Sequence, residues 1–330
     1  MSWPTFWRRK TTLSYLLTPL SWLYLWASRQ HQQRQLRRCE PLPVPVIVVG
    51  NIVVGGTGKT PFIHWLVTQL QAHGQRPAIV SRGYGGNLKQ PTLLTPNHRA
   101  DEVGDEPLLL AQVTGVPVCI GRQRVDAVKL MLQHHPETTV VLSDDGLQHL
   151  SLPRDLEICL FDGSVGAGNA SVLPAGPLRE PLSRLQNVPL VISKGRAAEN
   201  LGLPAKKTAK VMQLTLGEPR HLNTGASLDP SAEAVHALCG IGQPESFFAA
   251  LRAQGWQFTP LALRDHQALS GQQLRALEGK TVLMTSKDAI KLKHQPLPFE
   301  AYEVPLQVSF SADDERTIMD TVIDRIQRPR

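Results

Sequence analysis

A glycine-rich turn that carries a lysine and a threonine is the strongest chemical signal in the chain. It reads Gly55-Gly56-Thr57-Gly58-Lys59-Thr60 and stands between a short apolar run and a helix-like segment. Backbone N–H groups of such a turn converge on phosphate, assisted by the positive end of the following helix. Lys59 would reach the β- and γ-phosphates, and the Thr60 hydroxyl would bind Mg²⁺. The expected nucleotide-binding stretch begins at Val53 and Val54, although the strict pattern has glycine where Val53 stands.

Two adjacent carboxylates follow a second apolar run. Asp144 and Asp145 come directly after the strand-like segment 139–143. A strand that delivers a carboxylate at its carboxyl end is how phosphate-binding α/β folds hold Mg²⁺. The sequence does not rank the two as metal ligand; we expect Asp144 at the metal and Asp145 on the substrate side.

A second acidic pair follows another glycine-rich segment. Arg82-Gly83-Tyr84-Gly85 precedes Asp105-Glu106 by about twenty residues. Asp105 or Glu106 can accept a proton from an attacking hydroxyl or support the metal. An Asp-Glu pair at this point can equally cap the helix that follows.

Apolar runs alternate with helix-like segments through the first two thirds of the chain. The expected strands are 44–49, 77–81, 116–120, 139–143, 156–161 and 188–193, with helices at 61–73, 106–113 and 122–134. Such alternation predicts an α/β fold with a parallel sheet of the P-loop type. Residues 41–205 are expected to form this nucleotide-binding domain.

The pattern changes beyond residue 205. Shorter strands are expected at 211–216, 234–239, 257–263, 281–285 and 302–308, with helices at 244–254, 271–277 and 312–326. We interpret residues 206–330 as a second, smaller α/β domain that closes the active-site cleft.

Charge and cysteine content limit the partners and the compartment. The formal net charge of +7 favours anionic partners such as phosphates and acidic lipid. The four cysteines are widely spaced and form no CxxC pair, which indicates a reducing compartment. Basic residues gather near the amino terminus and do not interleave with aromatic residues elsewhere, so we expect no nucleic-acid partner.

The first 40 residues combine aromatic, apolar and basic side chains. Four of the six tryptophans lie here, with a leucine-rich run from Leu13 to Ala27 and arginines on both sides. Tryptophan and arginine favour the headgroup level of a bilayer, and this run is too short for a comfortable span of about 20 residues. We expect residues 1–40 to be an in-plane anchoring helix and a basic linker. A helix packed on the protein core and a cleaved signal peptide are the alternatives.

A series of motifs spread over nearly the whole chain resembles the tetraacyldisaccharide 4'-kinases of lipid A biosynthesis. The matching stretches are Val49-Gly50-Asn51, the glycine-rich turn, Ser81-Arg82-Gly83-Tyr84-Gly85, Gly104-Asp105-Glu106-Pro107, Asp144-Asp145-Gly146-Leu147-Gln148-His149, Leu173-Pro174-Ala175-Gly176-Pro177-Leu178-Arg179-Glu180, Asp265-His266 and Thr285-Ser286-Lys287-Asp288. The turn alone is not specific to one family, but the ordered series is.

The resemblance implies transfer of the ATP γ-phosphoryl group to the 4'-hydroxyl of a tetraacylated glucosamine disaccharide 1-phosphate, at the cytoplasmic face of the bacterial inner membrane. ATP and Mg²⁺ are the implied cofactors. The expected catalytic residues are Lys59, Asp105 as base and His266 as its partner, and the expected metal ligands are Thr60, Asp144 and Glu106. Substrate contacts are expected from Asn51, Arg82, Tyr84, Asp145, Gln148, His149 and Arg179.

Other P-loop classes fit the sequence less well. Membrane-associated ATPases of the positioning or sorting type place a lysine immediately before the two glycines, where this chain has Val54. A regulatory GTPase would carry an Asn-Lys-x-Asp motif that binds guanine. The stretch Ser286-Lys287-Asp288 does not have the spacing of that motif. The sequence does not determine the oligomeric state.

Overall fold

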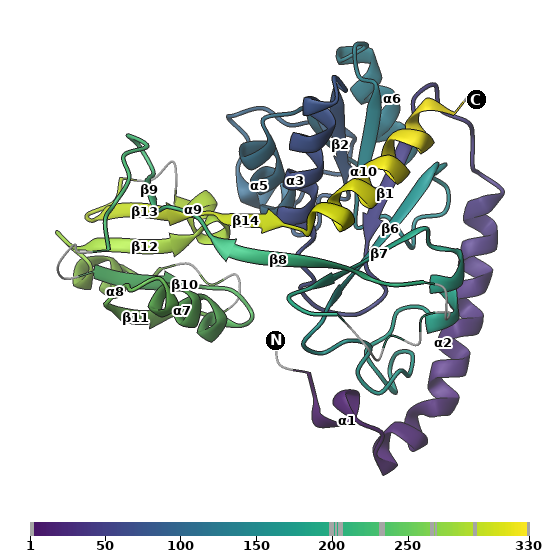
Figure 1. The fold of residues 1–330 in the computed structure, drawn as a ribbon, viewed down its shortest axis with the longest axis horizontal. Coiled ribbons are helices and arrows are strands. Elements are labelled where there is room, and N and C mark those ends of the chain that lie inside the picture. The colour runs from purple at the N-terminus through teal and green to yellow at the C-terminus, as the bar shows by residue number, and fades with distance from the viewer. Residues whose placement is uncertain are drawn as a thin grey trace.

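The computed structural model describes residues 3–197, 201, 203, 207–230, 235–264, 267, 269–292 and 296–328. His266 and the expected domain boundary at 205 and 206 lie outside this part of the chain. Within it the chain forms two sheets with helices packed on them (Figure 1). The α/β class expected from the sequence is confirmed.

The larger sheet is mostly parallel and has the order β14-β8-β7-β6-β1-β5-β2-β4-β3. Its strands are β1 (Val46–Gly50), β2 (Pro77–Ser81), β3 (Thr92–Leu93), β4 (Val118–Ile120), β5 (Val140–Asp144), β6 (Leu156–Asp162), β7 (Leu190–Lys194), β8 (Lys210–Leu216) and β14 (Leu306–Ser309). Strands β8 to β4 run parallel, and the edge strands β3 and β14 pair antiparallel. The parallel strands therefore deliver their carboxyl ends to one edge of the sheet.

Both faces of this sheet are covered. Val46 and Val48 of β1 face one core cluster, and Ile47 and Val49 face the other, so the strand is apolar at every position. The second cluster includes side chains of α3 (Lys59–Ala72), α5 (Asp105–Thr114) and α10 (Ala312–Gln327). The first cluster includes α6 (Arg124–His134), the segment 147–188 with a 3₁₀ turn at Leu182–Asn187, and part of α2.

The smaller sheet has the order β11-β10-β12-β13-β9. It comprises β9 (Arg220–His221), β10 (Val235–Cys239), β11 (Phe258–Ala262), β12 (Thr281–Thr285) and β13 (Glu300–Val304), with helices α7 (Pro244–Ala253), α8 (Gly271–Ala276) and α9 (Ser286–Leu292). Figure 1 shows this sheet at one end of the molecule, joined to the larger one through β8 and β14. Ile290 of α9 packs against Val103 and Leu108, at α4 (Ala100–Val103) and α5. The smaller sheet thus docks beside α5.

The amino-terminal helix α2 (Thr12–Leu36) lies along one side of the molecule, after the short α1 (Thr5–Arg8) (Figure 1). It buries Ser14 and Ser21, and the Ser21 hydroxyl donates to the Val172 carbonyl at 2.8 Å. Its exposed large side chains are Leu13, Tyr15, Leu16, Leu20, Trp22, Leu23, Trp26 and Leu36. This distribution is the reverse of a helix that meets water. Among the described residues, no helix has the length and apolar character needed to cross a membrane.

The structure differs from the sequence expectations in three places. The basic segment expected as a linker continues α2 as far as Leu36. The expected strand 302–308 is two strands, because Pro305 interrupts it and β13 and β14 join different sheets. The expected domain 206–330 does not coincide with the smaller sheet, since β8, β14 and α10 belong to the larger layer.

Candidate active site

The glycine-rich turn lies between β1 and α3, as the sequence predicts. Gly58 has φ +83°, and a Cβ there would lie 2.9 Å from the Met212 Cε, so the position requires glycine. Fully buried Asn51 donates its side-chain amide to the Gly55 carbonyl at 3.1 Å. The Thr57 hydroxyl is buried without a hydrogen-bond partner in the described residues. The turn is therefore braced from beneath while Gly55 stays exposed to a ligand.

A second segment closes the start of the turn. The Val54 N–H donates to the Pro177 carbonyl at 2.9 Å, and the Arg179 N–H donates to the Ile52 carbonyl at 2.7 Å. The Trp3 indole N–H donates to the Val54 carbonyl at 2.9 Å. Val53 is buried in the core and bridges to Leu178. The valine that replaces glycine in the strict pattern thus packs inward and anchors the 173–180 segment.

Asp145 connects the turn to that segment. Its carboxylate lies 3.3 Å from the Lys59 ammonium and 3.2 Å from the Arg179 guanidinium. Burial would raise the pKa of Asp145, but Lys59 and Arg179 outweigh burial and lower it. Its φ of +47° is in the left-handed region. Lys59, Asp145 and Arg179, which are far apart in the chain, therefore meet at one point.

Asp144 occupies a different electrostatic environment from its neighbour. It is buried, and the Ser81 hydroxyl donates to its carboxylate at 3.1 Å. Burial, together with the nearby charges of Glu106 and Asp145, raises the pKa of Asp144 to about 6, although Lys59 lowers it. Asp144, Asp145 and Glu106 thus lie near the Lys59 ammonium, and the negative charges of Asp145 and Glu106 disfavour the charged form of Asp144.

The residues around Asp144 fit a divalent cation. Such an ion would neutralise the excess negative charge of Asp144, at the end of β5, and of Glu106, in the first turn of α5. Hydroxyl and carboxylate oxygens are the ligands that Mg²⁺ prefers. The unpartnered Thr57 hydroxyl and the partly buried Thr60 lie on the turn beside them. The expected metal ligands Thr60, Asp144 and Glu106 therefore come from elements that converge.

The segment 82–86 packs against the start of α5. A Cβ on Gly104 would lie 2.3 Å from the Tyr84 carbonyl, and the Asn87 N–H donates to the Glu102 carbonyl at 3.0 Å. Tyr84 is 81% exposed, so its ring is open to a ligand. Asp105 and Glu106 begin α5 beside this segment, where the helix end favours charged carboxylates.

Buried Arg124 and half-buried His149 form a polar pair beside Asp144. The Arg124 guanidinium donates to the Asp144 carbonyl at 3.2 Å, and the backbone N–H of Arg124 donates to His149 Nε2 at 3.3 Å. Burial lowers the pKa of Arg124 to about 10. Burial, and then the charges of Arg124, Arg154 and Arg82, lower the pKa of His149 to about 4. His149 is therefore neutral near pH 7.

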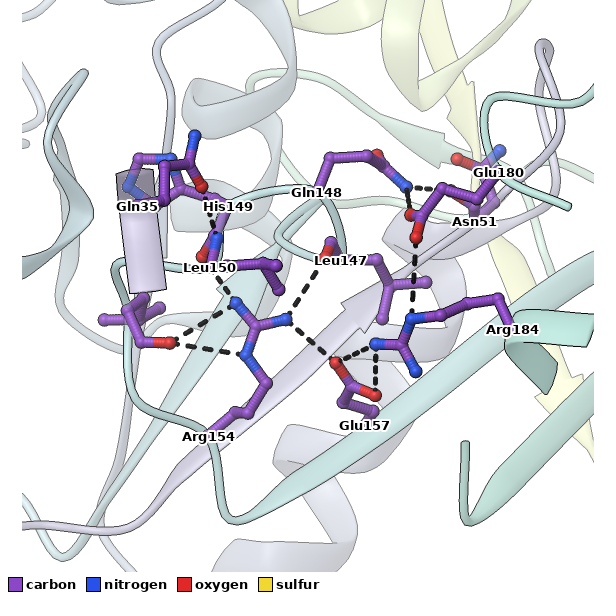
Figure 2. Close-up of polar contacts among 11 residues, drawn as sticks. Gln35, Asn51, Leu147, Gln148, His149, Leu150, Arg154, Glu157, Glu180 and Arg184 are labelled. Carbon is purple, nitrogen blue, oxygen red and sulfur yellow. Dashed lines mark hydrogen bonds and ion pairs between the residues drawn. The ribbon is translucent and has the colours of Figure 1, made fainter. Parts of the chain in front are cut away.

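Figure 2 shows a buried ionic network that the sequence analysis did not identify. Glu157 accepts two hydrogen bonds from Arg184, at 2.5 and 2.6 Å, and one from Arg154 at 2.8 Å (Figure 2). Arg154 also donates to the Leu147 carbonyl at 3.1 Å and to the His149 carbonyl at 2.5 Å. The network thereby holds the segment that follows Asp144 and Asp145.

The other arm of this network reaches the glycine-rich turn. Arg184 lies 3.5 Å from Glu180, and the Gln148 amide donates to Glu180 at 2.6 Å and to the Asn51 carbonyl at 3.2 Å. The sequence analysis expects Asn51 and Gln148 as substrate contacts, and Glu157 is a carboxylate within the apolar run 156–161. Its partners come from distant segments, which no local pattern specifies.

Replacing Glu157 is expected to destabilise the fold. Glu157→Ala leaves the partly buried Arg154 and Arg184 without their common partner. Breaking a buried pair costs about 3–5 kcal/mol. The free energy of unfolding in denaturant measures this loss. Asp324→Ala is the matched control, because the exposed Asp324–Arg328 pair is expected to contribute less than about 1 kcal/mol. Equal stabilities of the two variants would contradict the network.

The structure thus brings most of the expected site residues together, but they differ in what they contact. Lys59, Asp144, Asp145 and Arg179 lie together at the carboxyl ends of β1 and β5. Asn51 and Gln148 lie beneath the turn as bracing groups, and His149 contacts Arg124. Arg82 and Tyr84 are exposed at the rim. His266 lies outside the described residues.

Comparison with known proteins identifies the family to which this arrangement belongs. The model of the tetraacyldisaccharide-1-P 4'-kinase family matches residues 13–326. The chain belongs to this family. Relatives named tetraacyldisaccharide 4'-kinase include one from Azoarcus sp. (strain BH72), 41% identical over 99% of this chain and 96% of the relative. Another, from Pseudomonas fluorescens (strain Pf0-1), is 45% identical over 84% of this chain and 83% of the relative.

A solved structure from the same family has the same fold. It is LpxK from Aquifex aeolicus in a crystal structure described as a complex with ATP. The TM-score is 0.77 at 27% sequence identity, and the match covers 96% of this chain and 100% of that one. The family resemblance seen in the sequence motifs is therefore confirmed.

Proposed function

We propose that the chain is a lipid kinase that transfers the γ-phosphoryl group of ATP to the 4'-hydroxyl of a tetraacylated glucosamine disaccharide 1-phosphate, forming lipid IVA. The observation that carries this proposal is the meeting of Lys59, Asp145 and Arg179 at the end of a P-loop, in a chain of the 4'-kinase family. Phosphoryl transfer requires mainly positioning and charge neutralisation, and this cluster supplies both.

Some residues of the site bind the nucleotide and its metal, and others act on the hydroxyl that accepts the phosphoryl group. Lys59 and the N–H groups of residues 55–60 bind the phosphates, and Thr60, Asp144 and Glu106 would hold Mg²⁺, which would neutralise phosphate charge. Asp105, at the start of α5, accepts the proton of the acceptor hydroxyl. His266 orients or polarises Asp105 from the smaller unit, which docks beside α5.

A hollow beside Arg179 suits the acceptor. It has a volume of about 330 Å³ and lies between α2 and the segment 179–187. Arg29, Arg179 and Arg184 are among its lining residues, so anionic and hydroxyl groups of a sugar phosphate meet donors there. Arg179 also contacts Asp145, which links this hollow to the phosphate-binding turn. We propose it as the binding site of the disaccharide head.

We further propose that α2 binds the enzyme to the cytoplasmic face of the inner membrane, peripherally or monotopically. A four-chain lipid leaves the bilayer with difficulty, because each buried methylene contributes about 0.8 kcal/mol. The exposed leucines and tryptophans of α2 would enter the interface, and the arginines toward its end would meet lipid phosphates. The cytoplasmic side is the side that holds ATP.

Substitution on the exposed face of α2 tests the membrane proposal. Leu16→Gln, Leu23→Gln and Trp26→Gln together remove apolar groups that are 71%, 59% and 62% exposed, so the fold should be retained. Flotation with vesicles of anionic and zwitterionic lipid should show the variant shifted to the soluble fraction. Leu88→Gln, on an exposed loop of the larger unit, is the control. Undiminished vesicle binding of the triple variant would refute the anchor. High salt should release little intact protein, because apolar burial is not screened.

The reaction itself is tested by following the label of γ-labelled ATP. With Mg²⁺ and acylated disaccharide 1-phosphate, the label should enter the lipid, and little should be released as inorganic phosphate. A P-loop ATPase of the positioning or sorting type would instead release labelled phosphate and leave the lipid unlabelled. That result would replace the proposed function with the alternative.

A further inference from the structure

Three neighbouring parallel strands end beside the phosphate-binding turn. The turn follows β1, β6 ends at Asp162 and β7 ends at Lys194, and Asp162 and Lys194 are register partners. Ligands of open α/β sheets bind in the crevice outside the carboxyl ends of the strands. Lys194 is therefore in a ligand-facing position that none of the roles described above uses.

The stem of Lys194 lies against the turn itself. A Cβ on Gly58 would be 3.5 Å from the Lys194 Cδ and 2.9 Å from the Met212 Cε. The methylenes of Lys194, which is 27% exposed, and the fully buried thioether of Met212 thus border the last glycine of the turn, where α3 begins. They lie on the β7–β8 side of β1.

The ammonium of Lys194 is held in place by a carboxylate. Lys194 Nζ lies 2.5 Å from the Asp162 Oδ2, with the two side chains 27% and 12% exposed. Burial raises the pKa of Asp162, but the hydrogen bonds from Lys194 and Ser164 outweigh burial and lower it. Asp162 is therefore charged near neutral pH, and its contact with the ammonium fixes the direction of the lysine stem.

The geometry of the rest of the site determines which part of a nucleotide reaches this place. Ser81, Glu106 and Asp144 lie on the β5–β2 side of β1, so the metal and the γ-phosphate belong there. A nucleotide whose phosphates lie over the turn must then extend its nucleoside in the opposite direction, toward β6 and β7. The partly exposed Lys194 lies in that direction.

We propose that Lys194 is a nucleotide-binding residue whose stem, fixed by Asp162, supports the adenine ring of ATP. The proposal rests on the proposed use of ATP at this turn. A lysine stem presents an apolar surface while its charged end stays solvated or paired, and a cation near a π-face adds attraction. Because Asp162 neutralises the ammonium, Lys194 differs from Lys59, which is directed at phosphate.

Two ligands separate a base contact from a phosphate contact. Calorimetric titration of the full chain with Mg·ATP and with inorganic tripolyphosphate should show that Lys194→Ala weakens ATP binding by roughly 5- to 30-fold. Binding of tripolyphosphate, which has no base, should be unchanged. Lys194→Met keeps the stem and loses the charge, so its loss for ATP should be smaller. Lys210→Ala is the control. Lys210 also pairs with a carboxylate, Asp314, but it is the first residue of the adjacent strand β8, whereas Lys194 is the last residue of β7.

Equal losses for ATP and tripolyphosphate in Lys194→Ala would overturn the proposal, because they would indicate a phosphate contact or a disturbed turn. Unchanged ATP binding would also overturn it. A selective loss for ATP in Lys210→Ala as large as that in Lys194→Ala would overturn it too. Failure of the unaltered chain to bind ATP would contradict the proposed function, which is a different result from any of these.

Discussion

Lys59→Ala is expected to lower turnover on the lipid acceptor by about 10²–10³-fold, the cost typical of removing one preorganised donor from a transition state. Lys59 lies at the start of α3 and its ammonium is partly buried, 3.3 Å from Asp145. Its loss removes a positive charge from the β- and γ-phosphates and also leaves Asp145 with Arg179 as its remaining cation among the described residues. Initial rates at saturating ATP and lipid measure the effect.

The control for this substitution is Lys129→Ala. Lys129 also pairs with a carboxylate, Glu40, at 3.1 Å, but on the exposed surface of the larger unit. Its removal should leave turnover within about twofold, since exposed pairs contribute little. If Lys59→Ala retained near-normal turnover while folded, the phosphate-binding assignment of the turn would be wrong.

A double-mutant cycle on Asp105 and His266 has the second largest expected effect. General acid–base catalysis typically contributes about 10²–10⁴-fold, so Asp105→Ala and His266→Ala should each cause a loss in this range. If His266 acts through Asp105, the second substitution adds little to the first, and the double variant should be nearly as active as the worse single one. Turnover at saturating ATP is the measurement.

A second double-mutant cycle, on Asp105 and Asp324, gives the result expected for two residues that act independently. Asp324 is exposed on α10 and pairs with Arg328, remote from the proposed chemistry. Asp105→Ala combined with Asp324→Ala should lose the product of the two single effects. If Asp105→Ala combined with His266→Ala also lost the product of its two single effects, the two residues would act independently and the dyad would be refuted.

The parts of the fold and site that the sequence predicted are those that local patterns specify. β1, the turn and α3 follow one another within about 30 residues, and fully apolar strands indicated a sheet buried on both faces. Asp144 was identified because it directly follows such a strand. The carboxyl ends of parallel strands meet at one edge, so the convergence of Lys59 and Asp144 was also predictable.

The parts that the sequence did not predict depend on long-range packing. β8 and β14 pair only because the chain leaves and re-enters the larger sheet around the smaller one. The Glu157 network joins segments that are up to about 100 residues apart, such as Asn51 and Gln148. The buried serines of α2 were unexpected because periodicity shows which side chains share a face, and not which face meets the protein.

The position of the transferred phosphate tests the central claim most directly. The product made from ATP and acylated disaccharide 1-phosphate should carry one new phosphate, and phosphorus–proton correlation by NMR should connect it to the proton at carbon 4' of the distal glucosamine. Lys59→Ala should give little of this product, and Lys129→Ala a normal amount. A new phosphate at another position, or an unphosphorylated lipid in the presence of active ATP hydrolysis, would contradict the account.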